Sequence, residues 1–211
     1  SSNNIMGTLN LLNAALKHSV RKVIFSSSAA VYGNPEVLPI PANHTIKPIS
    51  AYGISKYCVE QYLYFYHLLH GLDYTVLRYS NVYGQRQDGA GEGGVIATFI
   101  ERIKNNEQIF IHGDGNQTRD FIYIQDVVAA NLRAIESGNN EIFNIGTKEQ
   151  TSINELFTIL SKMLDYNKKA CYGPSRPGDI THSSLDNRKA QELLGFSARF
   201  TLKQGLEEIL L

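Results

Sequence analysis

Hydrophobic positions recur at helical spacing near the start of the chain, at Ile5, Leu9, Leu12, Ala15 and Leu16. This pattern predicts a helix that Asn3 or Asn4 caps and that runs to about residue 17. Further helices are expected over residues 51–70, 95–104, 126–136 and 153–164. Ser50 is suited to cap the helix over 51–70, and Gly71 is suited to end it.

Short apolar runs alternate with these helices. They predict strands at residues 22–25, continuing into Ser26–Ser28, and at 74–79, 109–111 and 142–146. Because strands and helices alternate along the chain, the sheet should be largely parallel, with helices on both faces. The sequence therefore predicts an α/β fold.

Composition narrows the class of protein. Twenty basic residues balance twenty acidic residues in 211, and this zero net charge argues against nucleic acid as a partner. No apolar run approaches the roughly 20 residues that span a bilayer, so no membrane partner is expected. Cys58 and Cys171 lie far apart, which excludes a disulfide framework and favours a reducing compartment, here the cytoplasm. His67 and His70 have no evident third ligand, so no metal site is expected.

The chain begins with serine and enters a helical pattern at once. It lacks the basic start and apolar stretch of a signal peptide. We expect that the chain is a piece of a longer protein, cut at its N-terminus.

Tyr52 and Lys56 lie four residues apart on one predicted helix, so their side chains share a face. An ammonium group near a phenol favours the phenolate and lowers the tyrosine pKa from about 10, which would make the tyrosine a usable base. A solvated helix face explains the same spacing, because such a pair often arises by chance. The pair alone does not decide between these interpretations.

Polar residues follow two of the predicted strands, at Ser26–Ser28 and at Ser80-Asn81. Ligands of open parallel sheets bind beyond the carboxyl ends of the strands, although polar residues there also form turns. Arg119 and Arg176 each lie in a glycine- or proline-containing loop, where a guanidinium can grip phosphate or simply be solvated.

Residues 89–94 spell G-x-G-x-x-G, but the preceding strand ends about ten residues earlier, so we reject a dinucleotide loop there. No nucleophile-elbow motif supports a hydrolase.

Five motifs taken together resemble one family. They are Ser26–Gly33, Tyr52–Lys56, Leu77–Gly84, Gly113–Asp120 and Arg176–Asp179. Their order and spacing are similar to those of the extended short-chain dehydrogenases/reductases, and in particular the UDP-glucose 4-epimerases. The resemblance implies a partial Rossmann-type, doubly wound parallel sheet with an interleaved smaller α/β substrate lobe. Residues 1–83 would be the later part of the NAD-binding domain, whose first half is missing. Residues 84–211 would be mainly the UDP-sugar lobe, with segments near 120–147 returning to the NAD-binding domain.

The resemblance also assigns roles. Tyr52 would take the proton from the sugar 4-hydroxyl, Lys56 would hold the nicotinamide ribose, and Ser28 would bind the reacting oxygen. The residues expected to contact NAD are Asn3, Ser26, Tyr52, Lys56, Tyr79 and Ser80. Those expected to contact the UDP-sugar are Ser28, Asn81, Arg119, Arg176, Asp179 and Ser183. The expected reaction is epimerisation at C4 through a transient 4-keto sugar. The 211 residues alone are expected to be inactive.

Ala29 and Ala30 stand where dehydratases and decarboxylases of this family usually carry acidic residues, which favours an epimerase. Another sugar-nucleotide epimerase, or an inactive fragment that keeps a UDP-sugar surface, remains an alternative. The small Ser183 predicts that N-acetylated UDP-sugars are also accepted, although it could be a serine with no role in selection.

The resemblance further implies a homodimer formed through the helix over residues 8–17 and the helix that carries Tyr52. Burial of both helix faces within one subunit is the alternative.

Overall fold

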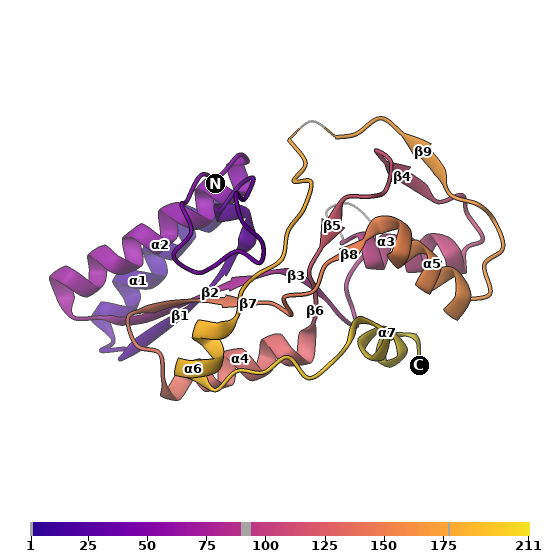
Figure 1. The fold of residues 1–211 in the computed structure, drawn as a ribbon. Helices are drawn as coiled ribbons and strands as arrows, with labels where there is room; N and C mark the ends of the chain where they lie inside the picture. The colour runs from indigo at the N-terminus through magenta and orange to yellow at the C-terminus, as the bar shows by residue number, and fades with distance from the viewer. Residues whose placement is uncertain (1, 90–93, 177) are drawn as a thin grey trace.

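The computed structural model describes residues 2–89, 94–176 and 178–211. These residues form two lobes side by side, with α1, α2, α4 and α6 around one sheet and α3, α5 and α7 in the other lobe (Figure 1). The helices are η1 (Ser2–Met6), α1 (Gly7–Lys17), η2 (Ala29–Val31), α2 (Ala51–His70), α3 (Val95–Lys104), α4 (Ile124–Glu136), α5 (Ile153–Met163), α6 (Arg188–Leu194) and α7 (Leu202–Leu210). The strands are β1 (Lys22–Ser28), β2 (Asp73–Tyr79), β3 (Asn81–Tyr83), β4 (Phe110–His112), β5 (Thr118–Arg119), β6 (Phe121–Tyr123), β7 (Glu141–Ile145), β8 (Thr151–Ser152) and β9 (Cys171–Gly173).

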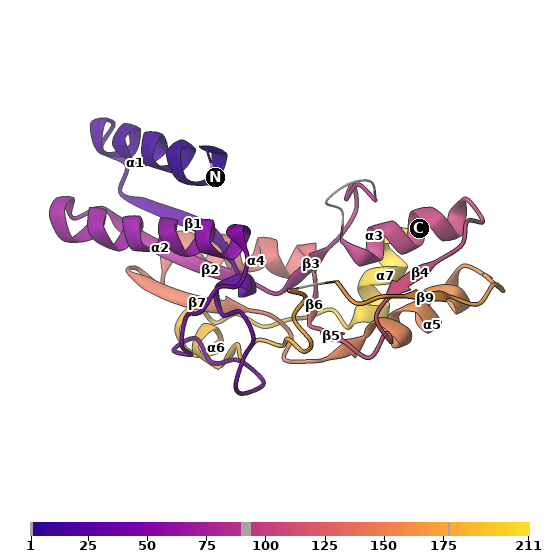
Figure 2. The ribbon, with the colours of Figure 1, turned by 90° about the horizontal axis from the view of Figure 1, so that it is seen from above.

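The first lobe is built on a parallel sheet in the order β1-β2-β7. Its two faces are covered by different helices, because successive residues of a strand point to opposite sides. On β2, Val76 belongs to the core under α1 and α2, and its neighbour Leu77 belongs to the core over α4 and α6. Helices therefore cover both faces, and Figure 2 shows α1 and α2 together on one side. The sequence-based α/β prediction is confirmed.

Helix α2 begins and ends where its sequence dictates. The side chain of Ser50 accepts a hydrogen bond from the Gly53 backbone N–H, and Gly71 ends the helix in the left-handed conformation. Inside the first lobe, the Glu60 carboxylate of α2 forms a buried ion pair with Arg78 of β2, at 2.6 Å. This pair ties α2 to the sheet.

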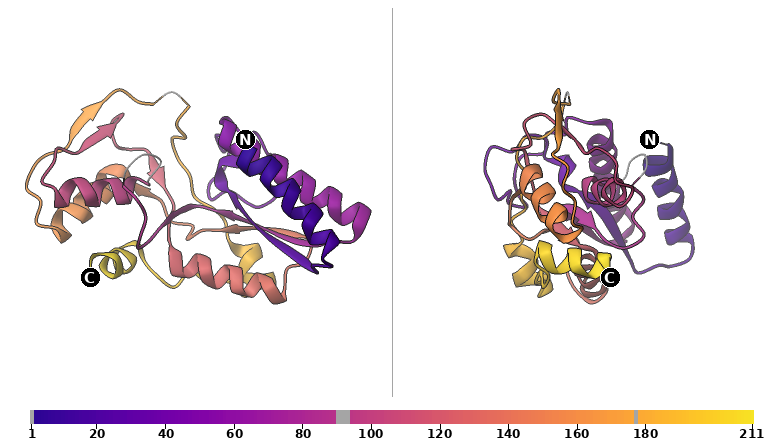
Figure 3. Two further views of the ribbon diagram at one scale, coloured as in Figure 1. Left: turned by 180° about the vertical axis from the view of Figure 1, so that it is seen from behind. Right: turned by 90° about the vertical axis from the view of Figure 1, so that its right-hand side faces the viewer.

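The second lobe packs α3, α5 and α7 around a separate apolar core, and the parallel pair β4-β9 lies at its edge. The parallel pair β3-β6 connects the lobes, and β5 pairs antiparallel with β8. The left view of Figure 3 shows the same division from behind.

One segment late in the chain, residues 181–187, crosses from one lobe to the other. We call it the strap. At one end the backbone of Thr118 bonds both Thr181 and Ser183, and at the other Ile40 bonds both Ser184 and Asp186. The strap therefore connects β5 with the loop that follows β1.

Several local predictions were wrong. Asn3 and Asn4 do not cap α1, because both lie within the π-helix η1, and α1 begins at Gly7 without a side-chain cap. The strand predicted at 109–111 is displaced by one residue. Five short strands were not predicted, because two or three residues are too few to show the alternation typical of a strand. The two C-terminal helices, α6 and α7, were not predicted either.

The described strands also form four separate sheets instead of one. The rejected glycine-rich loop falls largely on residues 90–93, which lie outside the described residues. Of the Arg176–Asp179 motif, Pro177 alone lies outside them. The division of the chain at residues 83 and 84 stays a prediction.

Candidate functional site

A cavity of about 210 Å³ lies between the carboxyl ends of β1 and β2 and the segment that leads into the strap. Seven residues singled out in the sequence line it, namely Ser28, Tyr79, Ser80, Asn81, Arg119, Asp179 and Ser183. They come from parts of the chain more than 150 residues apart, and the parallel sheet and the strap bring them together.

A larger cavity of about 740 Å³ shares Asn81, Arg119 and Asp179 with the first and extends toward α3 and β4. It adds Arg176, which the sequence also singled out, and Phe110 and His112, which it missed. Both missed residues lie on β4 on either side of the buried Ile111. The alternation around Ile111 could have indicated that they share one face.

Tyr52 and Lys56 lie on α2 next to the smaller cavity. Tyr52 is 51% exposed and does not line either cavity, but Ser50, two residues earlier, does line the smaller one. The Lys56 ammonium nitrogen is 5.6 Å from the centre of the Tyr52 ring and donates a 2.8 Å hydrogen bond to the Ser26 carbonyl. Burial lowers the pKa of the Lys56 ammonium group. The lysine is thus fixed between the end of β1 and the tyrosine.

The three serines that end β1 have different surroundings. The Ser26 hydroxyl lies 3.2 Å from the Tyr79 hydroxyl, which also accepts a hydrogen bond from Asn131 of α4. The Ser27 hydroxyl points to the opposite face and donates to Glu60. The Ser28 hydroxyl accepts a hydrogen bond from the Ala30 backbone and lines the smaller cavity.

Asn3, like Ser26, Tyr52 and Lys56, lines neither cavity. It is exposed on η1. Its neighbour Asn4 donates a hydrogen bond to the Ser55 hydroxyl of α2 at 2.9 Å.

The two cavities meet at an ion pair. The Arg119 guanidinium donates to the Asp179 carboxylate at 2.6 Å, and a second nitrogen of the same guanidinium donates to the Thr118 carbonyl. Asp179 is part of the segment that closes the cavity, so the pair joins opposite walls.

Comparison with known proteins assigns the chain to a family. Residues 1–146 match the model of the NAD dependent epimerase/dehydratase family. The chain belongs to this family. It is similar to the UDP-glucose 4-epimerase of Mycolicibacterium smegmatis, with 38% identity over 96% of this chain and 66% of that protein.

Two solved structures are also similar. One is the UDP-glucose 4-epimerase of Thermotoga maritima with UDP-glucose, at a TM-score of 0.97 and 47% identity over 99% of this chain and 68% of that one. The other is the UDP-N-acetylglucosamine 4-epimerase of Methanobrevibacter ruminantium with UDP-N-acetylmuramic acid, at 0.95 and 38%, with 99% and 68% covered. The chain spans about two thirds of the length of these relatives.

The described residues of this family member suit part of an NAD site. Lys56 presents an ammonium group at the carboxyl end of β1, and the buried Ser80 hydroxyl after β2 has no hydrogen-bond partner among the described residues. A nicotinamide ribose offers hydroxyls to the ammonium group, and a carboxamide offers the partner that the Ser80 hydroxyl lacks.

Within the described residues, no cluster of histidine, cysteine or carboxylate side chains could hold a metal ion. Of the helices described, none is both long and apolar enough to cross a membrane.

Proposed function

We propose that the full-length protein interconverts UDP-sugars that differ at C4 of the sugar, with NAD as its cofactor. One observation carries the proposal. Ser28, Asn81, Arg119, Asp179 and Ser183 line one cavity at the carboxyl ends of β1 and β2, directly beside the helix that carries Tyr52 and Lys56. Membership of an NAD-dependent epimerase/dehydratase family supports it.

In this proposal Tyr52 removes the proton from the sugar 4-hydroxyl and later returns it. Lys56, fixed by the Ser26 carbonyl, holds the nicotinamide ribose, and Ser28 orients the reacting oxygen. NAD, when bound, supplies the hydride acceptor. The absence of carboxylates at Ala29 and Ala30, which also line the cavity, leaves no side chain there to drive elimination or decarboxylation.

The nucleotide end of the substrate is assigned to the larger cavity. Arg119 and Arg176 offer guanidinium groups to the pyrophosphate, and Asp179 offers a carboxylate to the ribose. Phe110 and His112 provide flat surfaces against which a uracil ring can stack. Binding of the pyrophosphate would draw Arg119 from its ion pair with Asp179 and free both side chains for the ligand.

The test is direct. The full-length protein is incubated with UDP-galactose, the sugar protons are followed by NMR, and the protein is then denatured to measure released NAD. We expect UDP-glucose to form and NAD to be present. Formation of a dehydrated or decarboxylated sugar, or no reaction at all, would contradict the proposal.

Ser183 is proposed to set the range of sugars. It is buried in the cavity wall, and an acetamido group needs more room there than a hydroxyl. Replacing Ser183 by tyrosine should lower kcat/KM for UDP-N-acetylglucosamine by about 10- to 100-fold relative to UDP-glucose, since overpacking costs about 1–3 kcal/mol. The ratio of the two kcat/KM values measures this. An unchanged ratio would show that Ser183 does not select the sugar.

We further propose that two copies pair through α1 and α2. The outer faces of these helices expose a group of large apolar side chains, namely Leu11, Tyr64, Phe65, Leu68 and Leu69. Exposed apolar area of this kind marks an interaction site. Sedimentation at micromolar concentration should show a dimer, and the double variant Leu68→Lys/Leu69→Lys should be monomeric. Val37→Lys, at an exposed loop position, is the control that should stay dimeric. A monomeric unmodified protein would contradict this proposal.

The cytoplasm is the compartment proposed for the enzyme, because Cys58 and Cys171 are both free.

A further inference from the structure

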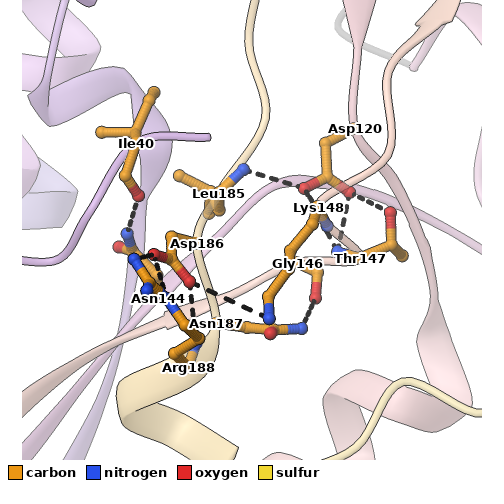
Figure 4. Close-up of polar contacts among 10 residues, drawn as sticks. All are labelled: Ile40, Asp120, Asn144, Gly146, Thr147, Lys148, Leu185, Asp186, Asn187 and Arg188. Atoms are coloured by element: carbon orange, nitrogen blue, oxygen red, sulfur yellow. Dashed lines mark hydrogen bonds and ion pairs between the residues drawn. The ribbon is translucent and has the colours of Figure 1, made fainter. Parts of the chain in front are cut away.

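Asp120 is a buried carboxylate between β5 and β6, and its hydrogen bonds come from two distant segments. It accepts from the backbone N–H of Thr147 at 2.9 Å and from the Thr147 hydroxyl at 2.7 Å. It also accepts from the backbone N–H groups of Lys148 and Leu185, at 3.3 and 3.0 Å. Figure 4 shows the carboxylate between the loop after β7 and the strap. All of these groups donate to the carboxylate and favour its ionised form, but burial outweighs them and raises the pKa of Asp120.

Residues close in sequence to Asp120 and to Leu185 line the smaller cavity. The Asp120 carbonyl accepts a 2.8 Å hydrogen bond from the Asn81 backbone, and Arg119 directly precedes Asp120. Both line the cavity on the sheet side. Across the cavity, Ser183 lies two residues before Leu185 in the strap. One carboxylate therefore connects the two walls from behind.

The carboxylate has little room to move. A Cβ atom added to Gly146 would lie 2.5 Å from one Asp120 oxygen and 2.9 Å from the Leu185 side chain. The Asn187 side chain, at the far end of the strap, donates to the Gly146 carbonyl at 2.7 Å, which holds this glycine in place. Asp120 therefore holds the strap at Leu185, next to the direct backbone bonds between Thr118 of β5 and residues Thr181 and Ser183.

We propose that Asp120 is a positioning residue that sets the distance between Asn81 and Arg119 on one wall of the UDP-sugar cavity and Ser183 on the other. Asp120 does not itself line the cavity and acts through the strap. This inference rests on the proposed function, because it takes the cavity to be the substrate site.

The test compares Asp120→Asn with a matched control in the full-length protein. Asp126 is also a buried aspartate, and its carboxylate accepts the backbone N–H groups of Arg199 and Phe200 far from either cavity. Both substitutions put an amide against backbone donors, so both should destabilise the fold. Only Asp120→Asn should raise the KM for the UDP-sugar and the Kd for UDP, by about tenfold, the effect expected if displacement of the cavity walls costs one hydrogen bond to the ligand. NAD content should not change.

A second variant keeps the proposal testable if Asp120→Asn does not fold. Gly146→Ala leaves the carboxylate chemically intact but displaces it, and should raise the same KM and Kd. Apparent Kd values rise when part of the protein is unfolded, so KM and Kd are measured at a temperature at which each variant is fully folded; a role in stability alone then does not change them. Wild-type KM and Kd in the folded variants, or equal changes in Asp126→Asn, would overturn the inference. If the unmodified protein binds UDP but interconverts no UDP-sugar, the proposed function fails, and the Kd comparison still decides the role of Asp120.

Discussion

Replacing Tyr52 by phenylalanine should lower the turnover of UDP-sugars by about 10²–10⁴-fold, the usual contribution of a positioned general base. The substitution removes one hydroxyl and keeps the ring, so the neighbouring Lys56 ammonium group retains the ring surface beside it. Tyr52 does not line either cavity, and UDP binding should therefore be nearly unchanged. Steady-state kinetics and calorimetric UDP titration of the full-length variant measure the two effects separately.

Tyr64 supplies a matched control on the same helix. Tyr64 is also 51% exposed, but it lies about three turns further along α2 than Tyr52. Tyr64→Phe removes the same hydroxyl and should turn over substrate at the normal rate. A Tyr52→Phe variant as active as Tyr64→Phe would show that Tyr52 is not the base.

Replacing Glu60 by glutamine should lower the free energy of unfolding by about 3–5 kcal/mol, the cost of leaving one charge of a buried ion pair without its partner. The side chains of Arg78 and Glu60 are 3% and 0% exposed. Burial alone would lower the pKa of the Arg78 guanidinium, but its interactions with Glu60 and Tyr32 together outweigh burial and keep this pKa above its usual value. Glutamine would keep one oxygen as an acceptor for Arg78, but it would carry no negative charge and would place an NH2 donor where the second carboxylate oxygen accepts from the guanidinium.

Urea denaturation measures the expected loss, and the melting temperature should fall by about 2–4 °C for each kcal/mol in a chain of this size. Glu207→Gln is the control, because Glu207 forms a solvent-exposed ion pair with Lys203 one turn away on α7. Exposed pairs of this kind contribute about 0.3–0.5 kcal/mol. A Glu60→Gln variant no less stable than Glu207→Gln would mean that the buried pair does not stabilise the fold.

The parts of the fold that follow from local chemistry could be predicted from the sequence. Ser50 and Gly71 fixed both ends of α2, and the β-branched and apolar runs located β1, β2 and β7. The polar residues at the end of β1 and after β2 were singled out because ligands of parallel sheets bind beyond the carboxyl ends of the strands. Ser28 and Asn81 line one cavity there, and their contact with a substrate stays a prediction.

What could not be predicted depends on contacts between distant residues. Nothing near Arg119 indicates that it pairs with Asp179, sixty residues later, or that Thr118 bonds the strap. The start of α1 was missed because η1 continues the helical spacing upstream without a capping side chain. Phe110 and His112 were missed because the alternation of exposed and buried residues around Ile111 extends over three residues only.

The strap has a consequence for the way the molecule loses its structure. It hydrogen-bonds to Ile40 in one lobe and to Thr118 in the other, and its Leu185 side chain is buried with Val31, Tyr32 and Ile40. Opening either lobe at these points breaks contacts of the strap, so the strap couples the unfolding of the two lobes. The amide hydrogens of Leu185 and Asp186, which are bonded to Asp120 and Ile40, should therefore exchange with solvent only when the strap detaches.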